Sequence, residues 1–214
     1  METVKEQQAI ALEVLRVTQS IMNDAIIAGG APRNWYQNKL AYDVDIYLWQ
    51  DKQGRLDRVA LKLGINPDDL REKKCSPDSD YVTDQITEVW EVDYKDQIIQ
   101  WIFLREKGVQ FQTLEEFVIE TFDFNICKCF FNESGDVLLT KEAKEDFDNQ
   151  TLTIDIFQMQ KYRRIERLPK RSRKLQEYYP NHKIVIAGNR VDSINVDEPR
   201  TTTTIIDQLN RLGF

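Results

Sequence analysis

Residues 26–48, IIAGGAPRNWYQNKLAYDVDIYL, join a short apolar run, a glycine pair and two aspartates on an alternating segment. Gly29 and Gly30 stand where a predicted strand turns into a helix, and such a turn lets backbone N–H groups approach a polyphosphate closely. In an extended strand, residues two apart share a face, so Asp43 and Asp45 present paired carboxylates. Paired hard oxygen ligands beside a phosphate cradle indicate magnesium-dependent phosphoryl or nucleotidyl transfer.

The same stretch resembles the signature of the DNA polymerase β-like nucleotidyltransferase superfamily, in particular the head domain of CCA-adding enzymes and bacterial poly(A) polymerases. That signature has a Gly-Gly pair, an arginine three residues on, and an Asp-x-Asp thirteen residues after the second glycine. Gly30, Arg33 and Asp43 stand at these positions. Two residues depart from the signature: Asn34 stands where the family has Asp, and Asn38 where it has a turn glycine. Asparagine tolerates the left-handed conformation that such a turn needs.

A second, shorter likeness lies at Asp123–Cys127, sequence DFNIC, which is similar to the family's Arg-Arg-Asp-Phe-Thr-Ile-Asn strand. Phe122 stands where the second arginine would be. Asp123 is therefore a candidate metal ligand or a contact to the nucleotide ribose, and the alternative is a structural acid at a strand edge. Asn125 is a candidate contact to the base or to a backbone group. The two likenesses together span residues 24–131.

The resemblance implies an α/β (α+β) fold, a mixed sheet flanked by helices, with one or two Mg²⁺ ions held by Asp43 and Asp45. It also implies that the Gly29-Gly30 backbone binds the phosphates of a nucleoside triphosphate, with Arg33 helping. Arg33 could instead fix the helix start by pairing with an acid. The family often adds a third carboxylate on a neighbouring strand.

The third carboxylate is not settled by the sequence. Gln100 stands near the centre of the predicted strand where the superfamily often places an acid, and an amide is a poor ligand for a hard metal. Asp123 is the better candidate, while Asp93 and Asp96 remain open as turn residues or ligands.

Composition limits the class of protein. The chain has 214 residues, of which 41% are apolar and 10% aromatic, enough for a real core. No run approaches the roughly 18 apolar residues of a membrane span, and the acidic, amphipathic start does not look like a signal peptide. The three cysteines form no metal or disulfide framework. A single histidine, His182, excludes most histidine-based metal sites and argues against a histidine-dependent triad. We expect a cytoplasmic protein.

The charge of the chain is unevenly distributed. The net charge is −7, yet residues 160–183 hold nine basic residues against two acidic ones, a net +7, which leaves −14 for the rest. We expect this basic segment to be a helix that binds RNA phosphates; the alternative is a solvated helix paired with the acidic body. The boundary predicted from it divides a nucleotidyltransferase-like domain, 1–158, from a basic helical extension, 159–214. The candidate RNA-binding residues are Arg163, Arg164, Arg167, Lys170, Arg171, Arg173 and Lys174.

Periodicity and turn signals predict interleaved helices and strands. Helices are predicted over residues 3–22, from Pro32 through Leu40, and over 54–63, 113–120, 141–147, 160–179 (interrupted at Pro169) and 205–212. Strands are predicted over 25–28, 43–48, 87–94, 97–104, 121–131, 137–139, 152–157 and 183–187. The pair 87–94 and 97–104 reads as a hairpin, which makes the sheet mixed.

These features together predict a nucleotidyltransferase that moves a nucleoside monophosphate from an NTP to a hydroxyl, with an RNA 3′ end, such as that of tRNA, as the acceptor. About 80 residues follow Phe131, too few for the long helical domains that hold tRNA in CCA-adding enzymes, so we expect a small stand-alone relative of bacterial or phage type. Two alternatives stay open. One is a non-catalytic nucleotide- or RNA-binding module on the same fold, and the other is an interaction protein such as an antitoxin or inhibitor.

Overall fold

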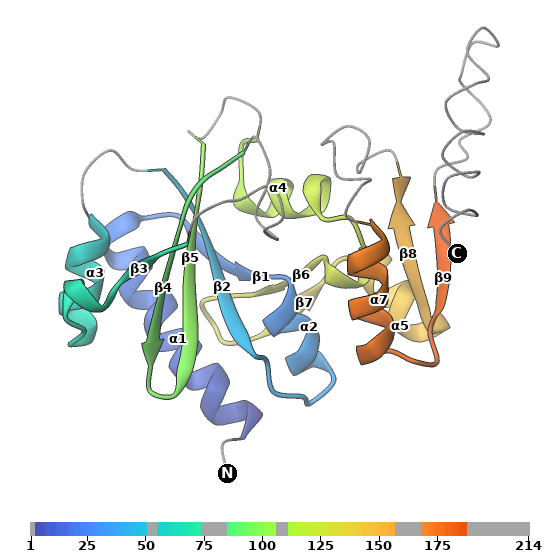
Figure 1. Cartoon of the computed structure of the whole chain (residues 1–214), viewed down its shortest axis with the longest axis horizontal. Helices are drawn as coiled ribbons and strands as arrows, with labels where there is room; N and C mark the ends of the chain where they lie inside the picture. Colours follow the sequence, from blue (N-terminus) through green and yellow to red (C-terminus); the bar gives the residue numbers. More distant parts are fainter. Residues whose placement is uncertain (1–2, 51–54, 74–84, 106–110, 157–167, 188–214) are drawn as a thin grey trace, which may run out of the picture.

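The computed structural model describes residues 3–50, 55–73, 85–105, 111–156 and 168–187. Seven strands form one sheet in the order β3-β4-β5-β2-β1-β6-β7, and two further strands, β8 and β9, form a second, parallel pair (Figure 1). The strands are β1 (Ala25–Ala28), β2 (Asp43–Trp49), β3 (Arg71–Glu72), β4 (Ile86–Tyr94), β5 (Gln97–Leu104), β6 (Cys129–Phe131), β7 (Val137–Leu139), β8 (Thr151–Asp155) and β9 (Lys183–Ala187).

The larger sheet is mixed, as the hairpin predicts. Strands β2 and β5 run parallel, and every other neighbouring pair in this sheet is antiparallel. The parallel pair sets Asp45 opposite Gln100 and Val44 opposite Ile99. The α/β (α+β) class predicted from the sequence is confirmed.

Helices cover both faces of the larger sheet (Figure 1). The helices are α1 (Val4–Met22), α2 (Gly30–Tyr36), α3 (Arg55–Leu63), α4 (Leu114–Thr121), α5 (Lys141–Asn149) and α7 (Leu168–Tyr178), with short 3₁₀ turns η1 (Pro67–Asp69) and η2 (Asn125–Cys127). Among the described residues, no helix has the length and apolarity needed to cross a membrane.

Strand β2 separates the two halves of the core. Val44 and Ile46 are fully buried and belong to the cluster beneath α1 and α3. Tyr47 points to the other face, where it meets Phe117 of α4 with ring centroids 5.9 Å apart. Asp43 and Asp45 share that second face, which is where the candidate site lies.

The prediction of one continuous strand over residues 121–131 is wrong. Phe124 pairs with Ile154 in an isolated bridge, and the carbonyl of Asp123 accepts a hydrogen bond from the amide of Asp155 at 3.1 Å. The turn η2 follows, and only then does β6 pair with β1. The segment pairs first with β8 of the second sheet and then with β1 of the larger sheet, and the chain changes direction at η2 to reach the second partner.

The described part of α7 begins at Leu168 and runs through Pro169 without a break, while residues 160–167 of the predicted helix lie outside the described residues. The boundary predicted at residue 158 stays a prediction, although β8 and β9, which lie on either side of it, pair along five residues. The helix predicted over 205–212 lies outside the described residues.

Candidate nucleotide site

Alternation along β2 places the two aspartates at the edge of the covered sheet face. Asp43 and Asp45 are half-buried, while Val44 between them is completely buried. Val44 cannot leave the core without a large loss of buried apolar surface, and it therefore holds Asp43 and Asp45 on the opposite face of the strand. The paired presentation expected from the period of two is present.

The glycine pair closes β1 and opens α2. Gly29 adopts φ +86°, a left-handed conformation that glycine reaches without the steric cost of a side chain, and its amide donates to the carbonyl of Cys129 at 3.0 Å. A Cβ added at Gly30 would find only a nitrogen of Arg33, at 3.9 Å. Gly30 therefore borders open space, as a residue whose backbone approaches a ligand must.

Arg33 is buried without a carboxylate partner among the described residues. Its guanidinium donates to the side-chain oxygen of Asn34 at 3.2 and 3.3 Å and to the sulfur of Cys127 at 3.2 Å. It also lies 5.9 Å from the ring centroid of Tyr178 and 5.7 Å from that of Tyr179. The alternative in which Arg33 pairs with an acid is not observed among the described residues. A buried guanidinium held by neutral groups favours an anionic ligand.

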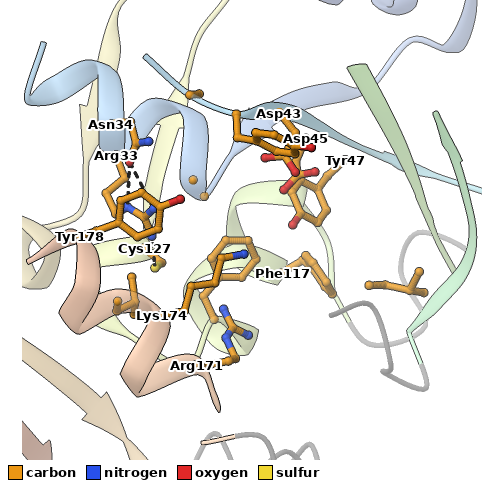
Figure 2. Close-up of a pocket in the computed structure, with 17 residues that line it drawn as sticks. Arg33, Asn34, Asp43, Asp45, Tyr47, Phe117, Cys127, Arg171, Lys174 and Tyr178 are labelled. Carbon is orange, nitrogen blue, oxygen red and sulfur yellow. Dashed lines mark hydrogen bonds between the residues drawn. The ribbon is translucent and has the colours of Figure 1, made fainter. Parts of the chain in front are cut away.

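One cavity of about 220 Å³ joins these groups (Figure 2). Its lining includes both glycines of the pair, Arg33, Asp43 and Asp45, which come from the turn after β1, from α2 and from β2. Helix α7 contributes the opposite wall, and its side chains project toward the aspartates in the close-up. The full lining is Gly29, Gly30, Arg33, Asn34, Ala41, Tyr42, Asp43, Asp45, Tyr47, Ile86, Phe117, Phe122, Cys127, Arg171, Lys174, Leu175 and Tyr178.

The candidate RNA-binding residues fall into three groups. Arg171 and Lys174 line the cavity. Lys170 and Arg173 are exposed on other sides of α7 and do not line it. Arg163, Arg164 and Arg167 lie outside the described residues.

The second motif does not enter the cavity. Asp123 is 1% exposed, and its carboxylate accepts from Nη1 of Arg171 at 2.5 Å. Asn125 begins η2 and is partly exposed. Neither residue is part of the lining, so both predicted contacts to metal or nucleotide remain predictions that this arrangement does not bring to Asp43 and Asp45.

Burial raises the pKa of the Asp43 carboxyl above its ordinary value of 3.8, and the positive charges of Lys174 and Lys73 oppose this rise. The cavity thus holds a carboxylate whose charge costs free energy until a cation meets it. Asp43 and Asp45 offer hard oxygens on one face, which fits Mg²⁺, an ion that is usually held by one or two carboxylates plus phosphate oxygens and water. Among the described residues, no cluster of three or more metal-binding side chains accompanies them.

The register across β2, β5 and β4 aligns Asp45 with Gln100 and then with the carboxylate of Glu91. Gln100 is opposite Asp45 on β5, and its Nε2 donates to Oε2 of Glu91 on β4 at 2.6 Å. Glu91 also pairs with Lys73 at 2.5 Å and with Arg71 at 3.4 Å. The side chain of Gln100 therefore lies between Glu91 and the aspartate pair.

Sequence reasoning missed part of the site. Tyr42, which is 77% exposed, and Cys127 both line the cavity. Asn34 was visible only as a departure from the family pattern, yet it orients Arg33. Arg171 and Lys174 were assigned to RNA because they lie in a basic run; their spacing of three, which puts both on one side of a helix, was the available signal.

Comparison with known proteins places the fold. No family model matches the sequence, and no curated protein matches it either. Among solved structures, a tRNA-processing enzyme in an apo form is 16% identical with a TM-score of 0.60, covering 100% of this chain and 49% of that one. The Thermotoga maritima CCA-adding enzyme complexed with tRNA is 11% identical with a TM-score of 0.57, covering 99% of this chain and 46% of its own. A tRNA nucleotidyltransferase complexed with a primer tRNA and an incoming ATP analogue is 17% identical with a TM-score of 0.54, covering 94% and 50%.

These matches define the class of fold. The chain has the mixed α+β fold of CCA-adding enzymes and tRNA-processing nucleotidyltransferases, as the resemblance at residues 26–48 predicts. It spans about half the length of the solved structures that it matches. At 11–17% identity, the likeness speaks for the fold, and activity has to be argued from the cavity.

Proposed function

We propose that the protein is a magnesium-dependent nucleotidyltransferase that moves a nucleoside monophosphate from an NTP to a hydroxyl acceptor. The observation that carries the proposal is the cavity itself. It brings a glycine turn, a buried arginine and two aspartates together from separate elements, and places two further cations opposite them. A fold alone does not require this combination, whereas nucleotidyl transfer needs each part.

Each group has a role in that reaction. The Gly29-Gly30 turn lets the β- and γ-phosphates approach the backbone, and Arg33 binds phosphate oxygens. Asp43 and Asp45 hold Mg²⁺, which when bound neutralises phosphate charge and lowers the pKa of the acceptor hydroxyl. The acceptor oxygen attacks the α-phosphorus in line, the bond from the α-phosphorus to the oxygen that bridges it to the β-phosphate breaks, pyrophosphate leaves, and the proton of the acceptor hydroxyl passes to solvent water. The side chains act by positioning and electrostatics.

The acceptor that we propose is the 3′ end of an RNA. Lys170 and Arg173 are exposed on α7 beside the cavity, where they can meet a phosphate backbone without entering the nucleotide site. Two of the solved structures with this fold are complexed with tRNA. A small hydroxyl acceptor would need no basic helix beside the cavity.

The test is transfer from α-³²P-labelled NTPs to bulk tRNA in the presence of Mg²⁺. The double variant Asp43→Asn with Asp45→Asn should lower the rate by at least about a thousandfold, because the metal ligands act as a unit. Labelled product at the wild-type rate from this variant would reject the site assignment.

A stability control makes a loss of activity interpretable. Because the folded state raises the pKa of Asp43, that carboxyl lowers stability once it ionises, above its ordinary value of 3.8. Without added Mg²⁺, the Asn variant should therefore unfold at a temperature equal to or above that of wild type at pH 7. The difference should shrink as the pH falls toward 4. Thermal melts at both pH values check this.

One observation favours a second function. Gln100 occupies the strand position opposite Asp45, and among the described residues no third carboxylate joins the aspartate pair. A non-catalytic module would bind NTP at the same cavity without transferring it. Mg²⁺-dependent NTP binding that is lost in the Asp43/Asp45 variant, with no transfer to any RNA tested, would select this alternative.

A further inference from the structure

Two cysteines flank Lys128 at the point where the turn η2 leads into β6. Both are free thiols and both are buried: Cys127 is 4% exposed and Cys129 is completely buried. Cys127 lines the cavity, whereas Cys129 does not belong to the lining. A small reagent that enters the cavity therefore meets the sulfur of Cys127 first.

The backbone between the two cysteines brings them close together. Lys128 has φ −78° and ψ 62°, which is the conformation of the central residue of an inverse γ-turn. In an extended strand the Cα atoms of residues two apart are separated by roughly 6.6 Å, near the upper limit of about 6.8 Å for a disulfide. The γ-turn bends the chain and shortens this separation, which places the pair within the range that a disulfide spans.

Each cysteine also holds one part of the proposed phosphate site. Nη1 of Arg33 donates to Sγ of Cys127 at 3.2 Å, and Figure 2 marks this bond with a dashed line. The amide of Gly29 donates to the carbonyl oxygen of Cys129 at 3.0 Å. A change in the geometry of the cysteine pair therefore acts on the buried arginine and on the glycine turn together.

The surroundings of the two sulfurs suit them to different steps of a thiol oxidation. Cys127 lies beside a guanidinium, and a cationic neighbour is typical of cysteines that react as thiolates. Burial is the main cause that raises the pKa of the Cys129 thiol, so this sulfur keeps its proton, and it donates to the carbonyl of Ile126 at 3.2 Å. Cys127 is thus placed to react first and Cys129 to react with the product.

We propose that Cys127 is a site of oxidation by hydrogen peroxide, and that Cys129 then closes a disulfide with it that weakens the phosphate site. The thiolate of Cys127 attacks one peroxide oxygen, so an S–O bond forms, the O–O bond breaks, and the leaving hydroxide takes up the proton that Cys127 released. The sulfur of Cys129 attacks that of Cys127, the S–S bond forms, the S–O bond breaks, and hydroxide leaves as water with the proton of Cys129. Two thiols lose two electrons, and one peroxide is reduced to two waters.

The disulfide acts on the cavity through the two hydrogen bonds. Drawing the sulfur of Cys127 toward Cys129 takes an acceptor away from the buried guanidinium of Arg33, and a buried donor without its partner is unfavourable. Closing the ring also shifts the carbonyl of Cys129 that holds Gly29. The expected loss of NTP binding rests on the proposed function for the identity of the ligand, whereas the oxidation itself does not.

The oxidation is tested on the reduced, folded protein with hydrogen peroxide, followed by alkylation of the remaining thiols and peptide mass spectrometry. We expect Cys127 and Cys129 to resist alkylation, to have lost two hydrogens together, and to be restored by dithiothreitol. In Cys129→Ala, the oxidation should stop at a sulfenic acid on Cys127, which dimedone traps. A peroxide treatment that leaves Cys127 as a thiol, or that joins it to Cys75 instead, would overturn the inference.

The effect on the cavity is tested by calorimetry with ATP and Mg²⁺ before and after peroxide. Oxidation should weaken ATP binding by about tenfold or more, and dithiothreitol should restore it. Cys127→Ser and Cys127→Ala, each compared with itself, should show no response to peroxide. The control Cys75→Ser removes the third cysteine of the chain, which lies outside the described residues, and should respond as wild type does. An equal response in the Cys127 variants would overturn the inference.

Amide exchange at Gly29, followed by NMR, gives a readout that needs no nucleotide. The exchange rate should rise by about tenfold on oxidation and return on reduction, because the amide loses its fixed acceptor. A reduced wild type that binds no ATP would reject the proposed function, while a disulfide with faster exchange at Gly29 would still support the inference. A disulfide that changes neither ATP affinity nor this exchange rate would overturn the link between the cysteine pair and the phosphate site.

Discussion

At the level of single residues, a substitution at Gly30 tests whether this glycine is needed for ligand access, because its backbone conformation does not require glycine. Its φ is not in the left-handed region, and a Cβ there would meet only a nitrogen of Arg33, at 3.9 Å. Gly30→Ala should therefore leave the melting temperature within a few degrees of wild type, since alanine favours the helix that begins here. The added methyl would occupy the space where we propose that the backbone meets phosphate, so NTP affinity should fall by about tenfold.

Gly64 provides the matched control for Gly30. It adopts φ +76°, and a Cβ there would meet nothing within 4 Å. Gly64→Ala should lower the free energy of unfolding by about 1 kcal/mol, because alanine is strained in this conformation, and should leave NTP affinity unchanged. Melting curves and NTP titrations of both variants provide the check. If both variants lost stability and affinity together, Gly30 would be a folding residue and not part of the phosphate cradle.

At the level of elements, α1 is fastened to the site by one buried side chain. The Oε1 of Gln7 accepts from Nε1 of Trp35 at 2.6 Å and from the amide of Ala41 at 2.7 Å, and its Nε2 donates to the carbonyl of Ala41 at 2.9 Å. These bonds fix α2 and the segment that leads into β2. Gln7→Leu should lower the free energy of unfolding by about 2–4 kcal/mol, because it leaves buried polar partners unpaired.

The neighbouring Gln8 is the control for this prediction. It is partly exposed on the same helix, and within the described part of the chain the hydrogen bonds from α1 to Trp35 and Ala41 all come from Gln7. Gln8→Leu should change the free energy of unfolding by less than about 0.5 kcal/mol. Urea unfolding followed by tryptophan fluorescence measures both variants. Equal effects would mean that the Gln7 bonds do not connect α1 to the site.

At the level of the whole molecule, the cavity lies between the large sheet and α7, which packs beside β8 and β9 (Figure 1). A ligand that contacts both sides should stabilise both by mass action. We expect bound ATP with Mg²⁺ to slow amide exchange, several-fold or more, in β1, α2 and β2 and also in α7, but not in α3 beneath the opposite face. Hydrogen exchange by mass spectrometry tests this. Protection that stops at β2 would show that α7 does not take part in binding.

Much of this architecture was predictable because its signals are local. Alternation identifies β2 and its outward aspartates, and the charged turn identifies the β4–β5 hairpin, whose two tip residues Lys95 and Asp96 have positive φ. Asn38 has φ 55°, as the family's turn glycine predicts. The segment 121–131 failed because its break is imposed by partners on two different sheets, which no local pattern records.

By itself, the sequence determined the order of the elements, the glycine turn and the side of β2 that carries Asp43 and Asp45, because each depends on neighbours only a few residues away. Tertiary structure alone decided that Arg171 and Lys174 face those aspartates and that Asp123 supports Arg171 from outside the cavity. Such contacts join residues 48 or more positions apart. They depend on how α7 and β8 pack against the large sheet, and a linear pattern holds no information about that docking.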